Sequence, residues 1–136
     1  MIYLDANVFV VANLNAEDLG DRARSLLEDV QVGKVEAASS ALTFDELVWA
    51  VKKYRTADDS IKAGEAFLNM PKLKLVAANG DILAMALSVM KEYRLDPRDA
   101  IHAASAQNEG AQVIVSFDKH FDRLKQFKRK DVMSLR

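Results

Sequence analysis

Short apolar runs alternate with longer segments of helical periodicity along this chain. This alternation is typical of βα units arranged around a parallel sheet. The fold is therefore expected to be α/β, in three layers (α/β/α), with a central, mostly parallel sheet of about five strands. The runs that we predict to be strands cover residues 2–5, 35–39, 73–77, 112–116 and 131–135.

Helix-like segments fill the spaces between these runs. The segment 17–32 carries apolar side chains on one helical face and is followed by Gly33, a residue often found just beyond a helix C-terminus. Another helix is expected to start after Asp96, with Pro97 in its first position and Gly110 just past its end. The other helices are expected to begin at Ser39 or Ser40, at Asp58 or Asp59 and at Asp81, and to reach about Tyr54, Asn69 and Tyr93.

Length and composition indicate a soluble protein with a single domain over residues 1–136. A chain of this size can bury most of its surface around one core. Its apolar runs are much shorter than the roughly 20 residues of a membrane span, and its N-terminus shows no export signal. The chain has no cysteine, which excludes disulfides and thiolate metal sites. A cytoplasmic location is the default expectation, and a net charge of −1 argues against a global positive field for nucleic acids.

Two acids follow strand-like runs, and this position is informative about chemistry. Asp5 ends the first run, and Asp118 follows the run over 113–117. If the two strands are parallel neighbours, these acids meet at the carboxyl edge of the sheet, where open α/β sheets bind ligands. Asn7 adds a polar group that could orient a carboxylate or a metal-bound water. A turn or a helix cap would also explain either acid.

Two further acids lie in helix-like segments. Glu46 is surrounded by apolar positions on both faces of its helix, so we expect that helix to be buried on both faces. A buried Glu requires a cation, an Arg or a hydrogen-bond network. Asp99 lies in the first turn after Asp96, where capping and the helix dipole would explain it equally well. A cluster of all four acids would repel itself unless a divalent cation lay among them.

The chain resembles the PIN domain family, and within it the small VapC-type toxins, through four motifs that occur in order. These are a strand ending in Asp-x-Asn (Ile2–Asn7), a Thr-x-x-Glu helix (Thr43–Glu46), an Asp that opens an Ala-rich helix (Pro97–Ala104), and a strand ending in Ser-x-Asp with a nearby Phe (Val115–Phe121). The resemblance covers nearly the whole chain. The chain differs at His120, where many members of the family carry another acid.

The resemblance implies a Mg²⁺- or Mn²⁺-dependent endoribonuclease that leaves 5′-phosphate and 3′-hydroxyl ends. Mg²⁺ prefers oxygen ligands, and a bound cation would activate water and stabilise charge on the phosphate. Asp5, Asp99 and Asp118 are then expected to bind the metal, and Glu46 to bind the metal or orient the attacking water. By this resemblance Asp99, rather than Asp96, is the third acid. Residues expected to hold these carboxylates in place are Asn7, Thr43 and Ser116.

The histidines and the basic residues have weaker interpretations. We expect His102 to be a packed or hydrogen-bonded helix residue, and His120 to contact solvent or phosphate rather than act in catalysis. Basic runs are usually solvated, although phosphate contacts would make RNA binding depend on salt. Contacts with RNA are expected from Lys52, Lys53, Arg98, Lys119 and His120.

Two other functions stay open at this point. A phosphotransfer domain, either a haloacid-dehalogenase-like phosphatase or a receiver, could use a strand-end Asp as its nucleophile, although Asn7 breaks the Asp-x-Asp pair that the phosphatase requires. A non-catalytic PIN-like module could bind a partner chain instead. The family resemblance implies a small antitoxin partner and a homodimer, and the apolar helices over 40–55 and 81–93 are candidate dimer surfaces.

Overall fold

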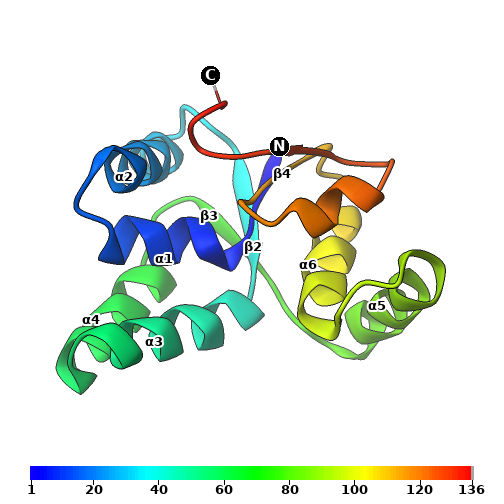
Figure 1. Cartoon of the computed structure of the whole chain (residues 1–136), viewed down its shortest axis with the longest axis horizontal. Coiled ribbons are helices and arrows are strands. Elements are labelled where there is room, and N and C mark those ends of the chain that lie inside the picture. The colour runs from blue at the N-terminus through cyan, green and yellow to red at the C-terminus, as the bar shows by residue number, and fades with distance from the viewer. Residues whose placement is uncertain (136) are drawn as a thin grey trace.

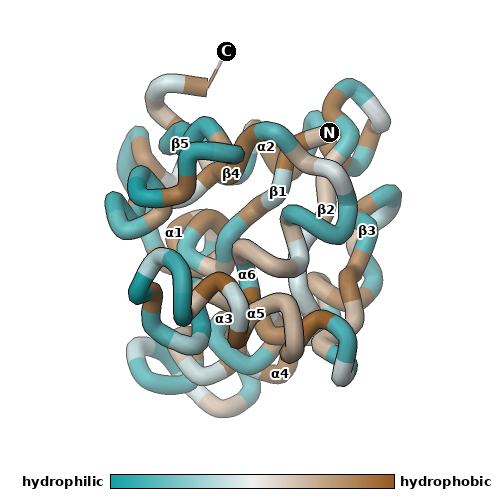
Figure 2. Tube along the Cα trace, turned by 90° about the vertical axis from the view of Figure 1, so that its right-hand side faces the viewer, coloured by the Kyte–Doolittle hydropathy of each residue, from teal (hydrophilic) through white to brown (hydrophobic). Residues whose placement is uncertain are grey.

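The structure is a computed structural model that describes residues 1–135. Its centre is a sheet of five parallel strands in the order β3-β2-β1-β4-β5, which Figure 2 shows side by side. The strands are β1 (Ile2–Leu4), β2 (Ala37–Ser40), β3 (Leu73–Val76), β4 (Val113–Val115) and β5 (Lys128–Lys130).

Helices cover both faces of the sheet (Figure 1), and two hydrophobic clusters join the layers. Successive side chains of a strand point to opposite faces, so Tyr3 and Ile114 face one layer while Leu4 and Val115 face the other. The α/β/α prediction is confirmed. One layer contains α1 (Ala6–Leu14), α2 (Asp18–Gln31), α3 (Leu42–Tyr54) and α4 (Ala57–Leu68), and the other contains α5 (Gly80–Tyr93), α6 (Pro97–Asn108) and the 3₁₀ helix η1 (Lys119–Arg123).

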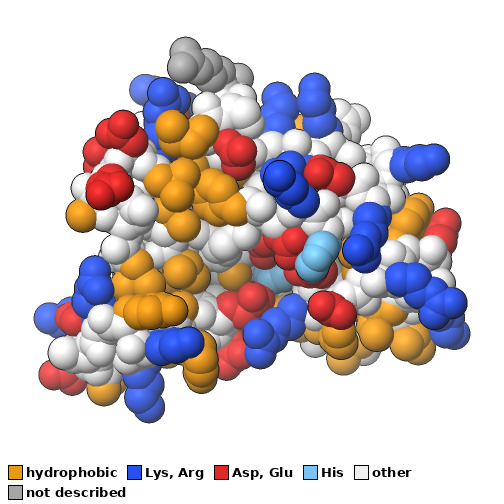
Figure 3. All heavy atoms as spheres, viewed as in Figure 1, with side chains coloured by type: hydrophobic (Ala, Val, Ile, Leu, Met, Phe, Trp, Pro, Cys, Tyr) orange, Lys and Arg blue, Asp and Glu red, His pale blue; other side chains and the backbone are white. Residues whose placement is uncertain are grey.

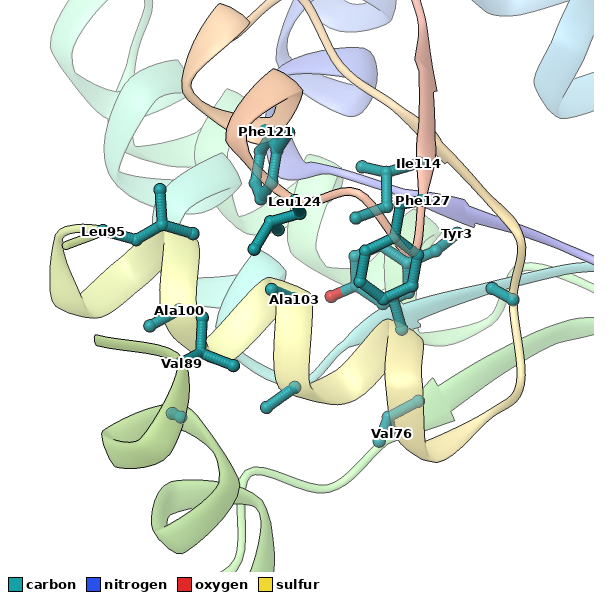
Figure 4. Packing of buried hydrophobic residues seen from close by; sticks show 14 of the residues in the cluster. Tyr3, Val76, Val89, Leu95, Ala100, Ala103, Ile114, Phe121, Leu124 and Phe127 are labelled. Atoms are coloured by element: carbon teal, nitrogen blue, oxygen red, sulfur yellow. The ribbon is translucent and has the colours of Figure 1, made fainter. Parts of the chain in front are cut away.

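The α5 and α6 layer packs closely because α6 is rich in alanine. Ala100, Ala103, Ala104 and Ala106 are almost completely buried, and small side chains let α6 lie close to the sheet and to α5. Figure 4 shows this cluster, with Tyr3 of β1 beside α6. The close approach fixes the backbone of α6 and with it the position from which Asp99 extends.

The fifth strand differs from its prediction. The expected strand over 131–135 is wrong, because β5 is Lys128–Lys130 and pairs with β4. This strand is hydrophilic (Figure 2), whereas the prediction relied on the apolar residues that follow it. An edge strand needs apolar residues on one face only, and basic side chains at an edge discourage pairing with another chain.

Three helices start at residues other than those predicted. Thr56 caps α4 and forms a capping box with Asp59, so Asp59 lies inside the helix rather than at its cap. Asn79 caps α5 through the Ile82 amide. Ala41 takes the cap position of α3, although the Ser40 hydroxyl accepts the Leu42 amide at the start of that helix. The predicted helix ends at Gly33 and Gly110 are confirmed, with φ angles of 81° and 70°.

The expectation that α3 is buried on both faces is also wrong. Leu47 and Val51 are buried, whereas Trp49 is 63% exposed and Phe44 is 39% exposed. The cause is the position of α3, which packs on α1 and α4 and leaves its remaining surface to solvent. None of the helices within residues 1–135 combines the length and the apolar character that crossing a bilayer would require.

Candidate metal centre

Four acids converge at the carboxyl edge of the central strands. Asp5 directly follows β1, and Asp118 lies three residues beyond β4, the neighbour of β1 in the sheet. Glu46 comes from α3 and Asp99 from the first turn of α6. Figure 3 shows acidic side chains gathered beside the histidines near the middle of this face, with basic side chains around them.

Asp5 is the most enclosed of the four acids, with 5% of its surface exposed. It caps α1 by accepting a hydrogen bond from the Ala6 amide, 2.8 Å from Oδ1. Its other oxygen accepts the hydroxyl proton of Ser116 at 2.6 Å. Burial raises the pKa of Asp5, although the charge on His102 and the bond from Ser116 lower it in part. A positive charge next to Asp5 would therefore stabilise its ionised form.

The Ser116 hydroxyl connects three of the expected site residues. Besides donating to Asp5, Ser116 Oγ accepts hydrogen bonds from Asn7 Nδ2 at 3.1 Å and from the Asp118 amide at 2.9 Å. Asn7 Oδ1 is buried and finds no hydrogen-bond partner within the described chain. Such an acceptor beside Asp5 suits a site in which hydrated cations or water complete the network.

His102 lies between two of the acids and is 1% exposed. Its Nε2 is 2.7 Å from Glu46 Oε1 and 3.4 Å from Asp5 Oδ1, while its Nδ1 is 2.7 Å from the Tyr3 hydroxyl. A carboxylate only accepts, so Nε2 carries the proton toward Glu46. Burial lowers the pKa of His102, but the bond to Glu46 and the charges of Asp5, Glu46 and Asp99 outweigh it and raise the pKa overall.

A second group consists of Asp99, Asp118 and His120, whose ligand atoms all lie within 4.8 Å of one another. His120 Nδ1 is 3.3 Å from Asp99 Oδ2 and 3.2 Å from Asp118 Oδ1. The Asp118 carboxylate also accepts the His120 amide and so begins η1. Burial and the negative charge of Asp118 raise the pKa of Asp99 to about 6. A cation among these groups would relieve that repulsion.

These donors fit a divalent cation. Carboxylate oxygens are the ligands that Mg²⁺ and Mn²⁺ take, and Mg²⁺ commonly keeps several waters. Burial raises the pKa of Asp5 and of Asp99, and the charge of Asp118 raises that of Asp99 further; a bound cation would favour the ionised form of both carboxylates. The imidazole of His120 would be better tolerated by Mn²⁺ than by Mg²⁺.

Within residues 1–135, Thr43 and the Lys and Arg residues expected to contact RNA do not bond to the four acids. Thr43 is buried, but its hydroxyl bonds Ser39 Oγ at 2.8 Å, and Ser39 donates to the Leu4 carbonyl. Arg98 lines the hollow beside Glu46. The remaining basic residues, Lys52, Lys53 and Lys119, are exposed, and Lys53 lies over the rings of Trp49 and Tyr54.

Two connections were missed by the sequence reasoning. His102 was expected to be packed or hydrogen-bonded, but not to join Glu46 to Asp5; its position three residues after Asp99, on the same face of the helix, was the available signal. Arg129 of β5 pairs with Asp122 at 2.8 Å and donates to the Ser116 carbonyl at 3.1 Å. This pair lowers the pKa of Asp122 and joins its carboxylate to β5.

Comparison with known proteins identifies the family. The model of the family described as PIN domain matches residues 2–126 of this chain. The chain belongs to the PIN domain family. The resemblance read from the four sequence motifs is thereby confirmed. A search among curated proteins finds no significant sequence match.

Solved structures share this PIN fold at low sequence identity. VapC20 of Mycobacterium tuberculosis, described as a sarcin–ricin loop cleaving toxin, is 14% identical with a TM-score of 0.75, covering 92% of this chain and 95% of that chain. VapBC2 of Rickettsia felis, solved with a promoter DNA fragment, is 20% identical with a TM-score of 0.75, covering 96% and 98%. FitAcB of Neisseria gonorrhoeae is 19% identical with a TM-score of 0.71, covering 99% and 100%.

Proposed function

We propose that this PIN domain protein is an endoribonuclease dependent on Mg²⁺ or Mn²⁺ and the toxin of a type II toxin–antitoxin pair. The observation that carries the proposal is the convergence of Asp5, Glu46, Asp99 and Asp118 at one sheet edge, with pKa values of Asp5 and Asp99 raised in the absence of a cation. Membership of a nuclease family supports the same reaction class. The proposal treats residues 1–136 as one domain acting on RNA in the cytoplasm.

Each acid has a distinct role in this proposal. Asp99 and Asp118 would bind the cation directly, because their carboxylates already face one another across His120. Asp5 would bind it directly or through water, held in place by Ser116 and the Ala6 amide. Glu46 would bind the metal or orient the attacking water, with its carboxylate fixed by His102.

The cation, when bound, would activate water for attack and stabilise the negative charge that develops on the phosphate. The chain itself would supply orientation and charge. His102 holds its Nε2 proton on Glu46, which leaves the second oxygen of that carboxylate free to accept a proton from water. Arg98, at the rim of the same hollow, would bind a phosphate oxygen of the substrate.

The structural relatives support the toxin–antitoxin part of the proposal. The Rickettsia felis structure is a VapBC complex with DNA, and VapC20 is described as a toxin that cleaves the sarcin–ricin loop. By this analogy we propose a small antitoxin partner for the present chain, and the family resemblance leads us to propose a homodimer as well. The exposed apolar side chains of α5, Leu83 and Leu87, are available for such an interface.

The phosphotransfer alternative is less consistent with the geometry. A nucleophilic Asp must reach the phosphorus atom of its substrate. Asp5 is buried, and Asn7 stands where the phosphatase would carry its second Asp. The intact set of acids also argues against a non-catalytic module.

The proposal is tested by incubating the purified protein with structured and single-stranded RNA, with Mg²⁺, with Mn²⁺ and with a chelator. We expect cleavage only with a divalent cation, and 5′-phosphate ends on the products. Asp5→Asn should abolish cleavage while circular dichroism stays unchanged. Cleavage that survives either the chelator or Asp5→Asn would refute the proposed chemistry.

A further inference from the structure

A hollow of about 280 Å³ adjoins the acid cluster on the α1 and α3 side. Asn7 and Glu46 form its end nearest the acids, and the rest of its wall consists of Ala6, Val10, Asp45, Trp49 and Arg98. The volume is close to the lower end of small-molecule pockets, about 300 Å³, so the hollow suits one small planar group rather than a large ligand. A second depression that shares Glu46 and Arg98 with it extends toward Asp99.

Trp49 is the most unusual residue of this hollow. It follows Glu46 by three residues, so both side chains lie on the same face of α3. It is 63% exposed, although burying a side chain of this size would stabilise the fold strongly. An indole left in solvent next to an acidic centre is poorly explained by folding and well explained by a ligand.

Cationic groups accompany the indole. The Lys53 Nζ lies 5.3 Å from the centre of the Trp49 ring, and the Arg98 side chain lines the same hollow. Lys53 lies over the ring of Trp49, yet the side chain stays largely exposed. An exposed aromatic ring accompanied by Lys and Arg is an arrangement by which proteins hold single-stranded nucleic acid, because a base stacks on the ring and the phosphate meets a cation.

We propose that the Trp49 hollow binds one unpaired nucleobase of the RNA substrate, next to the scissile phosphate. The indole stacks on the base, and Arg98 neutralises a phosphate between this base and the acid cluster. This inference rests on the proposed function and makes it more specific. The enzyme would cleave single-stranded or bulged RNA, in which a base can leave the stack, in preference to a continuous duplex.

The occupant is RNA rather than a second protein because the hollow is continuous with the candidate catalytic acids. Both depressions are lined by Glu46 and Arg98. A base stacked on Trp49 would therefore lie next to the acids that are proposed to cleave the phosphodiester. A protein interface centred on Trp49 would in addition bury the charges of Glu46 and Arg98, which is costly unless each is paired.

The first test uses the fact that Trp49 is the single tryptophan of the chain. Its fluorescence is measured in the Asp5→Asn protein during titration with a short single-stranded oligoribonucleotide. The matched probe is a chain of the same length in which the central nucleotides are abasic. We expect strong quenching by the first probe and little by the second. Equal quenching by both would mean that only the phosphates bind, and would overturn the inference.

The second test is kinetic, in otherwise wild-type protein. Trp49→Leu should raise KM for single-stranded RNA at least about fivefold, because a base loses its stacking partner. Trp49→Phe should restore most of the affinity. Tyr54→Leu, an equally exposed aromatic of the same helix, is the matched control and should change KM by less than about twofold. The melting temperature of Trp49→Leu should stay close to wild type because the residue is exposed.

The outcomes separate this inference from the proposed function. If the wild-type protein cleaves no RNA, the proposed function fails, and the fluorescence titration alone decides whether a base binds at Trp49. If it cleaves RNA while Trp49→Leu leaves KM and the cleavage positions unchanged, the inference fails and the function stands. A Trp49→Leu protein that changes only its oligomeric state would assign the residue to an interface between copies and would also overturn the inference.

Discussion

His102 donates its Nε2 proton to Glu46 Oε1 across 2.7 Å, joining α6 to α3 at the centre of the candidate site. The other ring nitrogen bonds the hydroxyl of Tyr3, which comes from the sheet. One buried imidazole thus connects both helical layers with the sheet between them. The orientation of Glu46 therefore depends on a residue of β1 that does not touch it.

Removing the Tyr3 hydroxyl should weaken this connection. Tyr3→Phe leaves a buried ring nitrogen of His102 without its partner, which should cost about 1–3 kcal/mol of unfolding free energy. Cleavage should fall as well, since the Nε2 proton is no longer held on Glu46. Chemical denaturation and RNA cleavage measure the two effects. Tyr54→Phe, at an exposed tyrosine, is the control; equal stability and activity of the two variants would contradict this role.

Asp99→Asn should separate stability from metal binding. Removing one of two facing carboxylates relieves repulsion with Asp118, so the melting temperature of the metal-free protein should rise. The wild-type protein should gain about 2.7 kcal/mol at a Mn²⁺ concentration about 100 times Kd, and the variant should lose most of this gain. Asp96→Asn, at the exposed start of the same helix, should keep the full stabilisation by Mn²⁺. A variant at Asp99 with an undiminished Mn²⁺ response would exclude the residue as a ligand.

The stability of the metal-free protein should fall as pH rises. Burial and Asp118 raise the pKa of Asp99 from 3.8 to about 6, so between these values the folded state binds more protons than the unfolded state, and stability declines through this window. His102 acts in the same direction: its raised pKa stabilises the fold below 6.5, and this contribution is lost as pH rises through the folded value.

Saturating Mn²⁺ should remove the Asp99 part of this trend, because a ligand carboxylate stays ionised. Thermal denaturation from about pH 5 to about pH 8, with and without the cation, measures both slopes. Metal affinity itself should increase with pH up to a value somewhat above 6. Identical pH profiles in the two conditions would show that the cation does not bind at Asp99.

Ser116→Ala should damage the site through loss of orientation. The hydroxyl donates to Asp5 and accepts from Asn7 Nδ2 and the Asp118 amide, so its removal leaves three polar groups with fewer partners. We expect a loss of about 1–3 kcal/mol in stability and of about 10- to 100-fold in metal affinity or cleavage. Ser60→Ala, a buried serine that bonds a carbonyl within α4, should retain activity. Calorimetric titration with Mn²⁺ measures the metal affinity of both variants, and equal affinities would contradict the role of Ser116.

Much of the fold and part of the site could be predicted from the sequence, and the reason for success or failure differs between residues. Asp5 and Asp118 could be placed because strand ends are visible as the ends of apolar runs and parallel neighbours end at one edge. The position of His102 on the same helix face as Asp99 is visible in the sequence, but its bond to Glu46 is not, because Glu46 lies 56 residues away and only packing brings the two together. Residues 131–135 were mistaken for a strand because the actual edge strand is basic and carries little hydropathy signal. The helix around Glu46 was expected to be buried on both faces, yet Trp49 is exposed, because apolar periodicity does not show which helix faces have a neighbour.

The pairing of β1 with β4 has a consequence for when the protein becomes active. These strands join residues 2–4 to residues 113–115, so the bond from Ser116 to Asp5 spans 111 positions. Synthesis must therefore pass Asp118 before all four acids can meet. A growing polypeptide that has not reached Asp99 holds Asp5 and Glu46 without the other two acids, so it lacks the complete cluster. The nuclease that we propose would therefore become active only after its C-terminal acids have been synthesised and folded against β1.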